Sequence, residues 1–212
     1  MSNATFPNGL TLTSTALTPK ALEVIVQGIT AQILGFDPVA NPAGAFDSVR
    51  VGWQGEGQPA WERTQDVCCV LCAAMNDPVS QFRDDTLVQN PDGSLTDEMA
   101  FTQVWKVHFT LYGPNCYDHA RLISSCMSFA WVHDLFAAQR LYAISRWERP
   151  QYVPENFAGQ WWERADLEYF FNELALENMA AEAAESVPIT LIKENGLEVT
   201  VTLTAPSSPL QN

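Results

Sequence analysis

One segment of the chain alternates so regularly that it constrains the fold more than any other. In FTQVWKVHFTLYG, residues 101–113, every second side chain from Phe101 to Leu111 belongs to one set, and five of its six members are apolar. A period of two is the signature of a β-strand with one buried face. The sequence therefore predicts a long strand with this core face: Phe101, Gln103, Trp105, Val107, Phe109 and Leu111.

Turn sequences predict two β-hairpins. Pro91-Asp92-Gly93 lies inside residues 82–112 and separates two segments with strand character, because Pro, Asp and Gly each favour tight turns. Asn195-Gly196 separates the two alternating arms of residues 188–204, and this dipeptide is the strongest sequence signal for a type I′ hairpin turn. Both hairpins favour a mostly antiparallel sheet.

Two further segments have the composition of strands. DVCCVLCAAM, residues 66–75, is a continuous apolar run, so we expect a central strand that is covered on both faces. In GQWWERADLEYFF, residues 159–171, alternate positions divide into a mostly apolar and a mostly polar set, which predicts a half-buried strand. That register puts Trp161 and Glu163 on the core face and Trp162 on the solvent face.

Helical signals occur at three places. Thr18-Pro19 provides an N-cap followed by proline at the first helical position, which predicts a helix over 19–34. Asn115 is expected to cap a second helix, whose apolar stripe extends as far as Trp131 and Leu135. The segment from residue 173 to residue 186 is rich in Ala and Glu and is expected to be helical.

These patterns predict an α/β (α+β) fold, in which a twisted, mostly antiparallel sheet carries two or more helices together with long loops and β-hairpins. We expect an N-terminal arm over 1–17, a single domain over 18–204 and a flexible tail over 205–212. Residues 36–63 are rich in Gly and Pro, which predicts a long loop.

The balance of charge narrows the class of protein. The 212 residues include 25 acidic and 11 basic side chains, which gives a net charge of −14. Nucleic-acid binding relies on Lys and Arg to displace counterions from phosphates, so the excess of acid argues against it. Charged residues make up only 17% of the chain, below the usual share of about 25%. This scarcity favours extensive burial in a core or in subunit contacts.

The cysteines point to a reducing compartment and to a structural role. Their number, five, is odd, and the first ten residues lack a basic-then-apolar leader, so we expect a cytosolic protein with reduced thiols. No apolar run approaches the roughly 20 residues that cross a bilayer, so no membrane partner is expected. Cys69 and Cys72 have the spacing of half a metal site, but residues three apart on a strand face opposite sides. We expect neither a metal nor a cofactor.

Two groups of residues could carry catalysis. Cys116 and His119 share a helix face near a helix start, where a thiol pKa can be lowered. Glu163, Asp166 and Glu168 could supply carboxylates for acid–base chemistry, although an interface or core ion pair is the commoner role. The sequence contains no Gly-rich phosphate loop, nucleophile elbow or metalloprotease helix motif. No catalytic residue is therefore assigned.

Four stretches of the chain are distinctive: VRVGWQGEGQPAW, DVCCV, VWKVHFTLYGPNCYDHARLI and VPENFAGQWWERADLEYFFNEL. In this order, over about residues 20–190, they resemble the neck and tail-terminator (tail-completion) proteins of long-tailed bacteriophages. The most specific parts are the FTLYGPN…DHAR and GQWWERxDL blocks. These blocks are strand, turn and packing sequences, not catalytic motifs.

The resemblance implies a non-enzymatic structural subunit that assembles as a homo-oligomeric ring, commonly six-fold, at the head-proximal end of the tail. Such a ring would cap the tail-tube protein, meet the head–tail connector protein, and contact a sheath if the tail is contractile. Genomic DNA would pass through an acidic channel without specific binding. The protein would be part of the virion neck, after assembly in the cytoplasm of the bacterial host.

A ring subunit needs exposed aromatic contacts, and the sequence offers a small set of candidates. We expect Trp162, Arg164 and the loop between two tryptophans, Trp53 and Trp61, to contribute to the subunit or partner interface. Two alternatives remain open at this point. One is a tail-tube or baseplate-completion subunit, and the other is a small cytosolic hydrolase that uses Cys116 and His119 or the acidic strand.

Overall fold

The fold is mixed α+β, as expected, and the chain divides into two compact units. The larger unit comprises Thr15–Arg83 and Ala100–Ala175, and the smaller one comprises Met1–Ser14, Asp84–Met99 and Leu176–Asn212. The expected boundaries at residues 17 and 204 remain a prediction. The computed structural model describes residues 2–7, 9–35, 49–52, 61–78, 82–144, 148–157, 159–181, 186–192 and 198–204.

A curled sheet forms the base of the larger unit. Its strands lie in the order β11 (Arg164–Ala181), β6 (Leu95–Tyr112), β4 (Val67–Met75) and β3 (Val49–Val51). Strands β4 and β6 are antiparallel, whereas the short β3 runs parallel to β4. Two further strands pair antiparallel with β11, namely β7 (Leu141–Ala143) and β8 (Gln151–Tyr152). The sheet is mostly antiparallel, as the hairpin signals predict.

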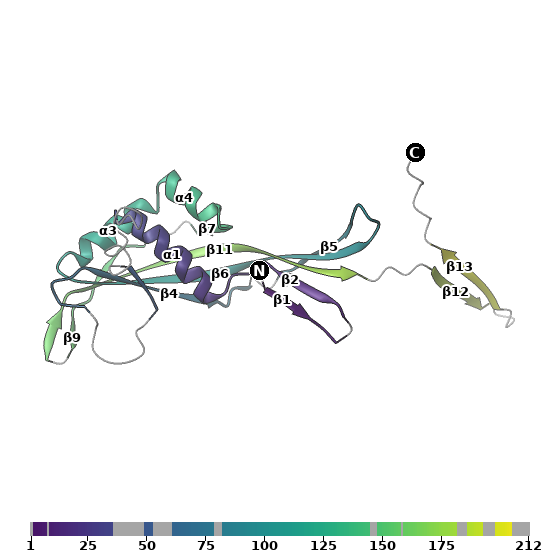
Figure 1. Cartoon of the computed structure of the whole chain (residues 1–212), viewed down its shortest axis with the longest axis horizontal. Helices are drawn as coiled ribbons and strands as arrows, with labels where there is room; N and C mark the ends of the chain where they lie inside the picture. The colour runs from purple at the N-terminus through teal and green to yellow at the C-terminus, as the bar shows by residue number, and fades with distance from the viewer. Residues whose placement is uncertain are drawn as a thin grey trace. The chain divides into compact units, whose positions relative to one another are not determined.

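Helices cover one face of this sheet (Figure 1). Helix α1 (Pro19–Ile33) confirms the predicted helix, since the Ala21 amide donates to the Thr18 hydroxyl at 3.2 Å. The second predicted helix is in fact two, α3 (Cys116–Cys126) and α4 (Ala130–Ala137). None of the helices among the described residues is long and apolar enough to cross a membrane.

Two expectations about α3 and α4 are corrected. Trp131 is exposed instead of lying in a continuous apolar stripe, because the chain turns at residues 127–129 and changes the face that α4 presents. Asn115 does not cap α3 through its side chain. Its amide nitrogen and its side-chain nitrogen instead donate to the two carboxylate oxygens of Asp66, both at 2.9 Å.

The core lies between the helices and one face of β6 and β11. Four of the predicted core residues of β6 are buried, namely Trp105, Val107, Phe109 and Leu111, whereas Phe101 and Gln103 are half-buried. On β11 the buried set is Ala165, Leu167, Tyr169, Phe171, Glu173 and Ala175. Helix α4 closes the core through Phe136, whose ring centroid lies 4.5 Å from that of Phe171.

Strand β4 is covered on both faces only in its first half, which corrects the expectation of burial along its whole length. Cys68, Val70 and Cys72 are buried in the core and Val67 is buried on the other face, but Leu71 and the residues from Ala73 to Met75 are exposed. An apolar run predicts that both faces are to be covered, but it does not specify whether the same chain covers them. Cys72 and the half-buried Cys69 lie on opposite faces of β4, as the alternation predicts.

The smaller unit consists of paired strands. Strand β1 (Ser2–Thr5) pairs with β2 (Thr11–Ser14), which pairs in turn with the end of β11. Strand β5 (Asp84–Gln89) pairs with β6, and β12 (Ser186–Ile192) pairs with β13 (Glu198–Thr204). Both predicted hairpins are therefore confirmed. The Asn195-Gly196 turn and the tail 205–212 lie outside the described residues.

The expected helix from residue 173 is wrong, because β11 continues as a strand to Ala181. Ala and Glu favour helices by only a few tenths of a kcal/mol each, roughly. Pairing with β2 and β7 outweighs that preference, since Glu177 lies opposite Ser14 and Glu173 lies opposite Leu141. Tertiary contacts therefore decide the structure of this segment.

Candidate docking surface around Tyr112 and Arg164

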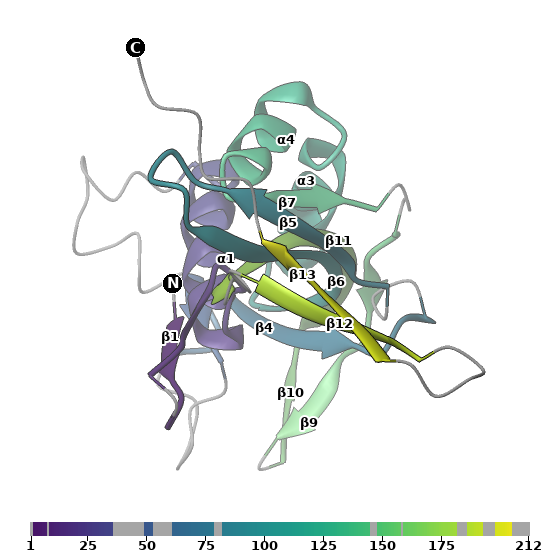
Figure 2. The same cartoon turned by 90° about the vertical axis from the view of Figure 1, so that its right-hand side faces the viewer.

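The adjacent tryptophans have the reverse of their expected roles. Trp161 is 65% exposed, whereas Trp162 is half-buried. Both belong to β10 (Gln160–Trp162), which pairs with β9 (Glu155–Phe157) in a separate two-stranded sheet. Figure 2 shows this hairpin on the side of the larger unit away from α4. Because the strand is interrupted at Glu163, the alternation of β11 does not extend back to the tryptophans.

Glu163 is exposed, which corrects its expected place on the core face. Its backbone carbonyl accepts the Gly113 N–H at 3.2 Å, so the interruption between β10 and β11 is attached to the turn after β6. Gly113 has a φ of +109°, and an added Cβ would lie 2.5 Å from the Gln65 carbonyl oxygen. Only glycine fits there, so this turn positions Tyr112 beside the tryptophans.

Three aromatic rings and two guanidinium groups meet at Tyr112. The ring centroid of Tyr112 lies 5.5 Å from that of Trp61 and 6.4 Å from that of Trp162, the latter edge-on. Arg50 stacks over Trp61 at 5.1 Å, and Arg164 lies 6.0 Å from the Tyr112 centroid. Burial and the nearby Glu155 raise the pKa of Tyr112, so its hydroxyl stays protonated. We call these five residues the aromatic cluster.

Two polar atoms of the aromatic cluster lack partners. The indole nitrogens of Trp61 and Trp162 are buried, and neither has a hydrogen-bond partner among the described residues. A buried donor without an acceptor costs about 1–3 kcal/mol.

A hollow of about 440 Å³ adjoins the aromatic cluster. Trp161 and Trp162 form part of its wall, and Tyr152 and Pro154 contribute further apolar surface. Arg63 and Glu163 supply one charge of each sign. A concave, aromatic and nearly neutral surface of this kind suits an apolar side chain or an extended segment of another protein.

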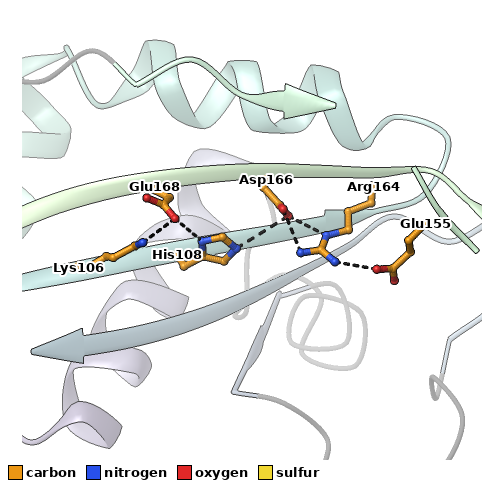
Figure 3. A network of polar contacts seen from close by, with 6 residues as sticks. All are labelled: Lys106, His108, Glu155, Arg164, Asp166 and Glu168. Carbon is orange, nitrogen blue, oxygen red and sulfur yellow. Dashed lines mark hydrogen bonds and ion pairs between the residues drawn. The ribbon is translucent and has the colours of Figure 1, made fainter. Parts of the chain in front are cut away.

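Arg164 connects the aromatic cluster to a row of charged residues (Figure 3). Its guanidinium donates to both carboxylate oxygens of Asp166, at 2.8 and 2.9 Å, and to Glu155 at 2.7 Å. Burial alone would lower the pKa of Arg164, but the bonds to Asp166 and Glu155 outweigh it and raise the pKa. The side chain is fixed by three charge-assisted bonds, so it is pre-organised for contact.

The charged row continues along the sheet. His108 lies 3.8 Å from Asp166 and 3.1 Å from Glu168, which also pairs with Lys106 at 2.6 Å. The hydrogen bond from Lys106 lowers the pKa of Glu168 although partial burial opposes it, and His108 adds to the lowering. These residues project from the face of β6 and β11 that the helices do not cover, as Figure 3 shows.

The structure brings three of the four expected interface residues together. Trp61, Trp162 and Arg164 surround Tyr112, while Trp53 lies outside the described residues. Sequence reasoning did not identify Tyr112 as the centre of the cluster. The available signal was its place: it is the last residue of a strand and falls on the face opposite the core set.

The comparison with protein families identifies the family of the chain. The model of the phage neck terminator protein family matches residues 20–199, which is most of the chain. The chain belongs to the phage neck terminator family. The family is structural, so this neck terminator is a virion component that contacts other tail or head proteins. No curated protein matches the chain closely enough to serve as a relative.

The environment of Cys116 does not favour the alternative of a cysteine hydrolase. Cys116 is buried, and burial raises the pKa of its thiol to about 11. The thiolate, which is the nucleophile, is therefore scarce at neutral pH. Among the residues that the structure describes, no group of three or more His, Cys, Asp or Glu side chains could hold a metal ion.

Proposed function

We propose that this neck terminator forms a ring, commonly six-fold in such proteins, that caps the tail tube and joins it to the head connector. The observation that carries the proposal is the hollow of about 440 Å³ beside the aromatic cluster. Its wall contains two exposed aromatic residues, Trp161 and Tyr152. A side chain or an extended segment of a neighbouring subunit or partner protein would fill it.

The exposed apolar surface supports assembly through side-chain packing. Trp161 is 65% exposed and Tyr152 is also largely exposed, and both line the hollow. Tryptophan, tyrosine and arginine are the residues that most often dominate binding energy at interfaces. Trp61, Trp162 and Arg164 are therefore the proposed anchors, and Trp53 remains a proposed contributor from the adjoining loop.

The distribution of charge supports passage of DNA without binding. The segments of the smaller unit contain ten acidic residues and one lysine, a net charge of −9 out of −14 for the chain. An acidic surface repels phosphates, so DNA would move past it without adhering. The smaller unit is therefore proposed to contribute acidic side chains to the channel.

Electron microscopy of particles made after disruption of the gene tests this role. Filled heads beside unattached tails, especially tails of uncontrolled length, are the expected result. Filled heads with no tails would instead favour a tail-tube or baseplate-completion subunit. Complete and infectious particles would overturn the assignment to the neck.

A point variant tests the aromatic cluster. Trp162→Ala is expected to leave the monomer folded but to reduce the number of infectious particles by at least tenfold. A tenfold change corresponds to the loss of about 1.4 kcal/mol of binding free energy, which is a modest value for an anchor residue. Tyr142→Ala is the matched control, because Tyr142 is an exposed aromatic residue on β7, away from the cluster. Normal particle yield with Trp162→Ala would refute its place in the interface.

A further inference from the structure

The hollow beside the aromatic cluster has a wall that suits one class of peptide. Trp161 and Tyr152 are 65% and 51% exposed on it, and Trp162 and Pro154 add further apolar surface. Surfaces lined by aromatic rings are the usual sites for proline-rich segments, because a polyproline II helix is already ordered before it binds and loses little entropy on docking. The chemistry of the wall therefore favours a proline-rich occupant.

The chain itself contains one segment with the spacing that such sites recognise. Of its 13 prolines, only Pro206 and Pro209 are separated by two residues, in the sequence APSSPLQN of the tail 205–212. A polyproline II helix has three residues per turn, so prolines three apart fall on the same side of it. The two rings of this segment can therefore pack together on one aromatic wall.

The tail is also compatible with the hollow in charge. Residues 199–212 contain no Asp, Glu, Lys or Arg, although the whole chain has a net charge of −14. The hollow carries Arg63 and Glu163, one charge of each sign. Two copies of an acidic chain can therefore bring this segment and this surface together without the repulsion that opposes most other contacts between them.

A ring requires two different contact elements on each subunit, because a head-to-tail contact joins one element to the other. The hollow is lined by residues of the larger unit, and the tail belongs to the smaller unit. Each copy therefore has one hollow and one tail. A copy that gives its tail to one neighbour and receives the tail of the other meets the requirement of a closed ring.

We infer that the tail 205–212 of one copy docks in the hollow of its neighbour, with Pro206 and Pro209 against Trp161 and Tyr152. The inference rests on the proposed role of the hollow in subunit contact and names the segment that occupies it. A segment of eight residues binds weakly by itself. In a ring the other contacts hold each tail close to its site, which raises its effective concentration there.

A synthetic peptide with the sequence of residues 205–212 tests whether the segment fits the hollow. The receiving protein is the full chain with Pro206→Ala and Pro209→Ala, whose own tail no longer competes. Isothermal titration calorimetry should show saturable binding of the peptide. A control peptide in which alanine replaces both prolines should bind at least about tenfold more weakly. Equal binding of the two peptides would overturn the inference.

A variant of the hollow locates the binding site of the peptide. Trp161→Ala removes the most exposed aromatic side chain of the wall and should weaken peptide binding by at least about tenfold. Tyr142→Ala, on β7, is the matched control and should leave binding unchanged. Both positions are exposed, so circular dichroism should show an unchanged fold. Full binding by Trp161→Ala would place the peptide elsewhere and overturn the inference.

Cross-linking tests whether the tail reaches a neighbouring copy. One preparation carries Ser208→Cys in the tail, and the other carries Thr64→Cys at the exposed wall of the hollow. Both have a Cys69→Ser background, because Cys69 is the free cysteine that is not fully buried. A short bis-maleimide should join the two preparations into a covalent pair of 23.5 kDa chains. Tyr142→Cys in place of Thr64→Cys is the control and should give no such pair.

The outcomes separate this inference from the proposed neck role. A chain with both Ser208→Cys and Thr64→Cys that forms an internal link, and no link between copies, would place the tail in its own hollow and overturn the exchange. Absence of any link at the highest soluble concentration would overturn it as well. In either case the neck role would still be decided by the gene disruption. Complete particles after disruption would remove the neck role, whatever the peptide and the cross-linking showed.

Discussion

Trp105 donates its indole N–H to Glu173 at 2.6 Å, inside the core between β6 and β11. The second carboxylate oxygen of Glu173 accepts the backbone N–H of Leu17, also at 2.6 Å. Glu173 is almost fully buried, and no basic side chain forms an ion pair with it among the described residues. The carboxylate thus joins the segment before α1 to the centre of the sheet.

Glu173→Ala is expected to destabilise the fold by about 2–6 kcal/mol, because it leaves one buried and one part-buried donor without an acceptor, at about 1–3 kcal/mol each. Trp105→Phe removes only one of the two bonds and should cost less. Urea unfolding followed by fluorescence measures both. Asn172→Ala, at the adjacent and less buried position, is the control. A loss of stability no larger than that of the control would contradict the role of Glu173.

Gly113→Ala should destabilise the turn that supports Tyr112. The new Cβ would lie 2.5 Å from the Gln65 carbonyl, in addition to the strain of a φ of +109°. Gly35→Ala serves as the control, because Gly35 has a φ of +75° but open space around its Cβ position. Backbone strain costs about 1–3 kcal/mol at either site. Urea unfolding should therefore show a clearly larger loss of unfolding free energy for Gly113→Ala than for Gly35→Ala. Equal losses in the two variants would disprove the steric requirement at Gly113.

The pair Lys106–Glu168 should make a pH-dependent contribution to stability. The pKa of Glu168 is lowered from 4.5 in the folded chain, so its contribution is present above that value and is lost as the pH falls through the lowered pKa. Glu168→Gln should cost about 0.2–1 kcal/mol at neutral pH, as is usual for an exposed pair.

Urea unfolding at several pH values checks this prediction. The difference between wild type and Glu168→Gln should shrink in acid. Glu148 and Glu168 line a second hollow of about 160 Å³, so Glu148→Gln is the control and should show a smaller difference at neutral pH. If the difference in unfolding free energy between wild type and Glu168→Gln stayed constant at pH values below the ordinary pKa of glutamate, this linkage would be excluded.

Cys116 should resist thiol reagents at neutral pH. Its side chain is buried and its pKa is raised to about 11, so the thiolate is rare. Maleimide labelling of the native protein, followed by peptide mass spectrometry, should find Cys69 modified before Cys116. Rapid and selective labelling of Cys116 would reopen the question of a cysteine nucleophile in this neck terminator.

Local signals in the sequence predicted much of the fold. Alternation along β6 identified four buried residues, and Thr18-Pro19 placed the start of α1. The turn sequences predicted both hairpins. These features depend on a few neighbouring residues and on the period of their side chains, so they can be recognised without knowledge of distant contacts.

Features that depend on distant partners were not predictable in the same way. The interruption at Glu163 arises from pairing with β9 and from the bond to Gly113, and it exchanges the roles of Trp161 and Trp162. The extension of β11 past Glu173 depends on β2 and β7. The candidate site combines residues from four separate segments, so the sequence suggested its aromatic members but not Tyr112 at their centre.

The charged row from Lys106 to Glu155 has a consequence for assembly in changing surroundings. Its members bind one another at distances between 2.6 and 3.8 Å within a single chain. Added salt would screen attractions inside each subunit and the mutual repulsion of the acidic copies, while apolar contacts made by Trp161 and Tyr152 at the proposed interface would persist. A neck joined in this way would hold through the change in ionic strength between the interior of a bacterium and dilute water outside.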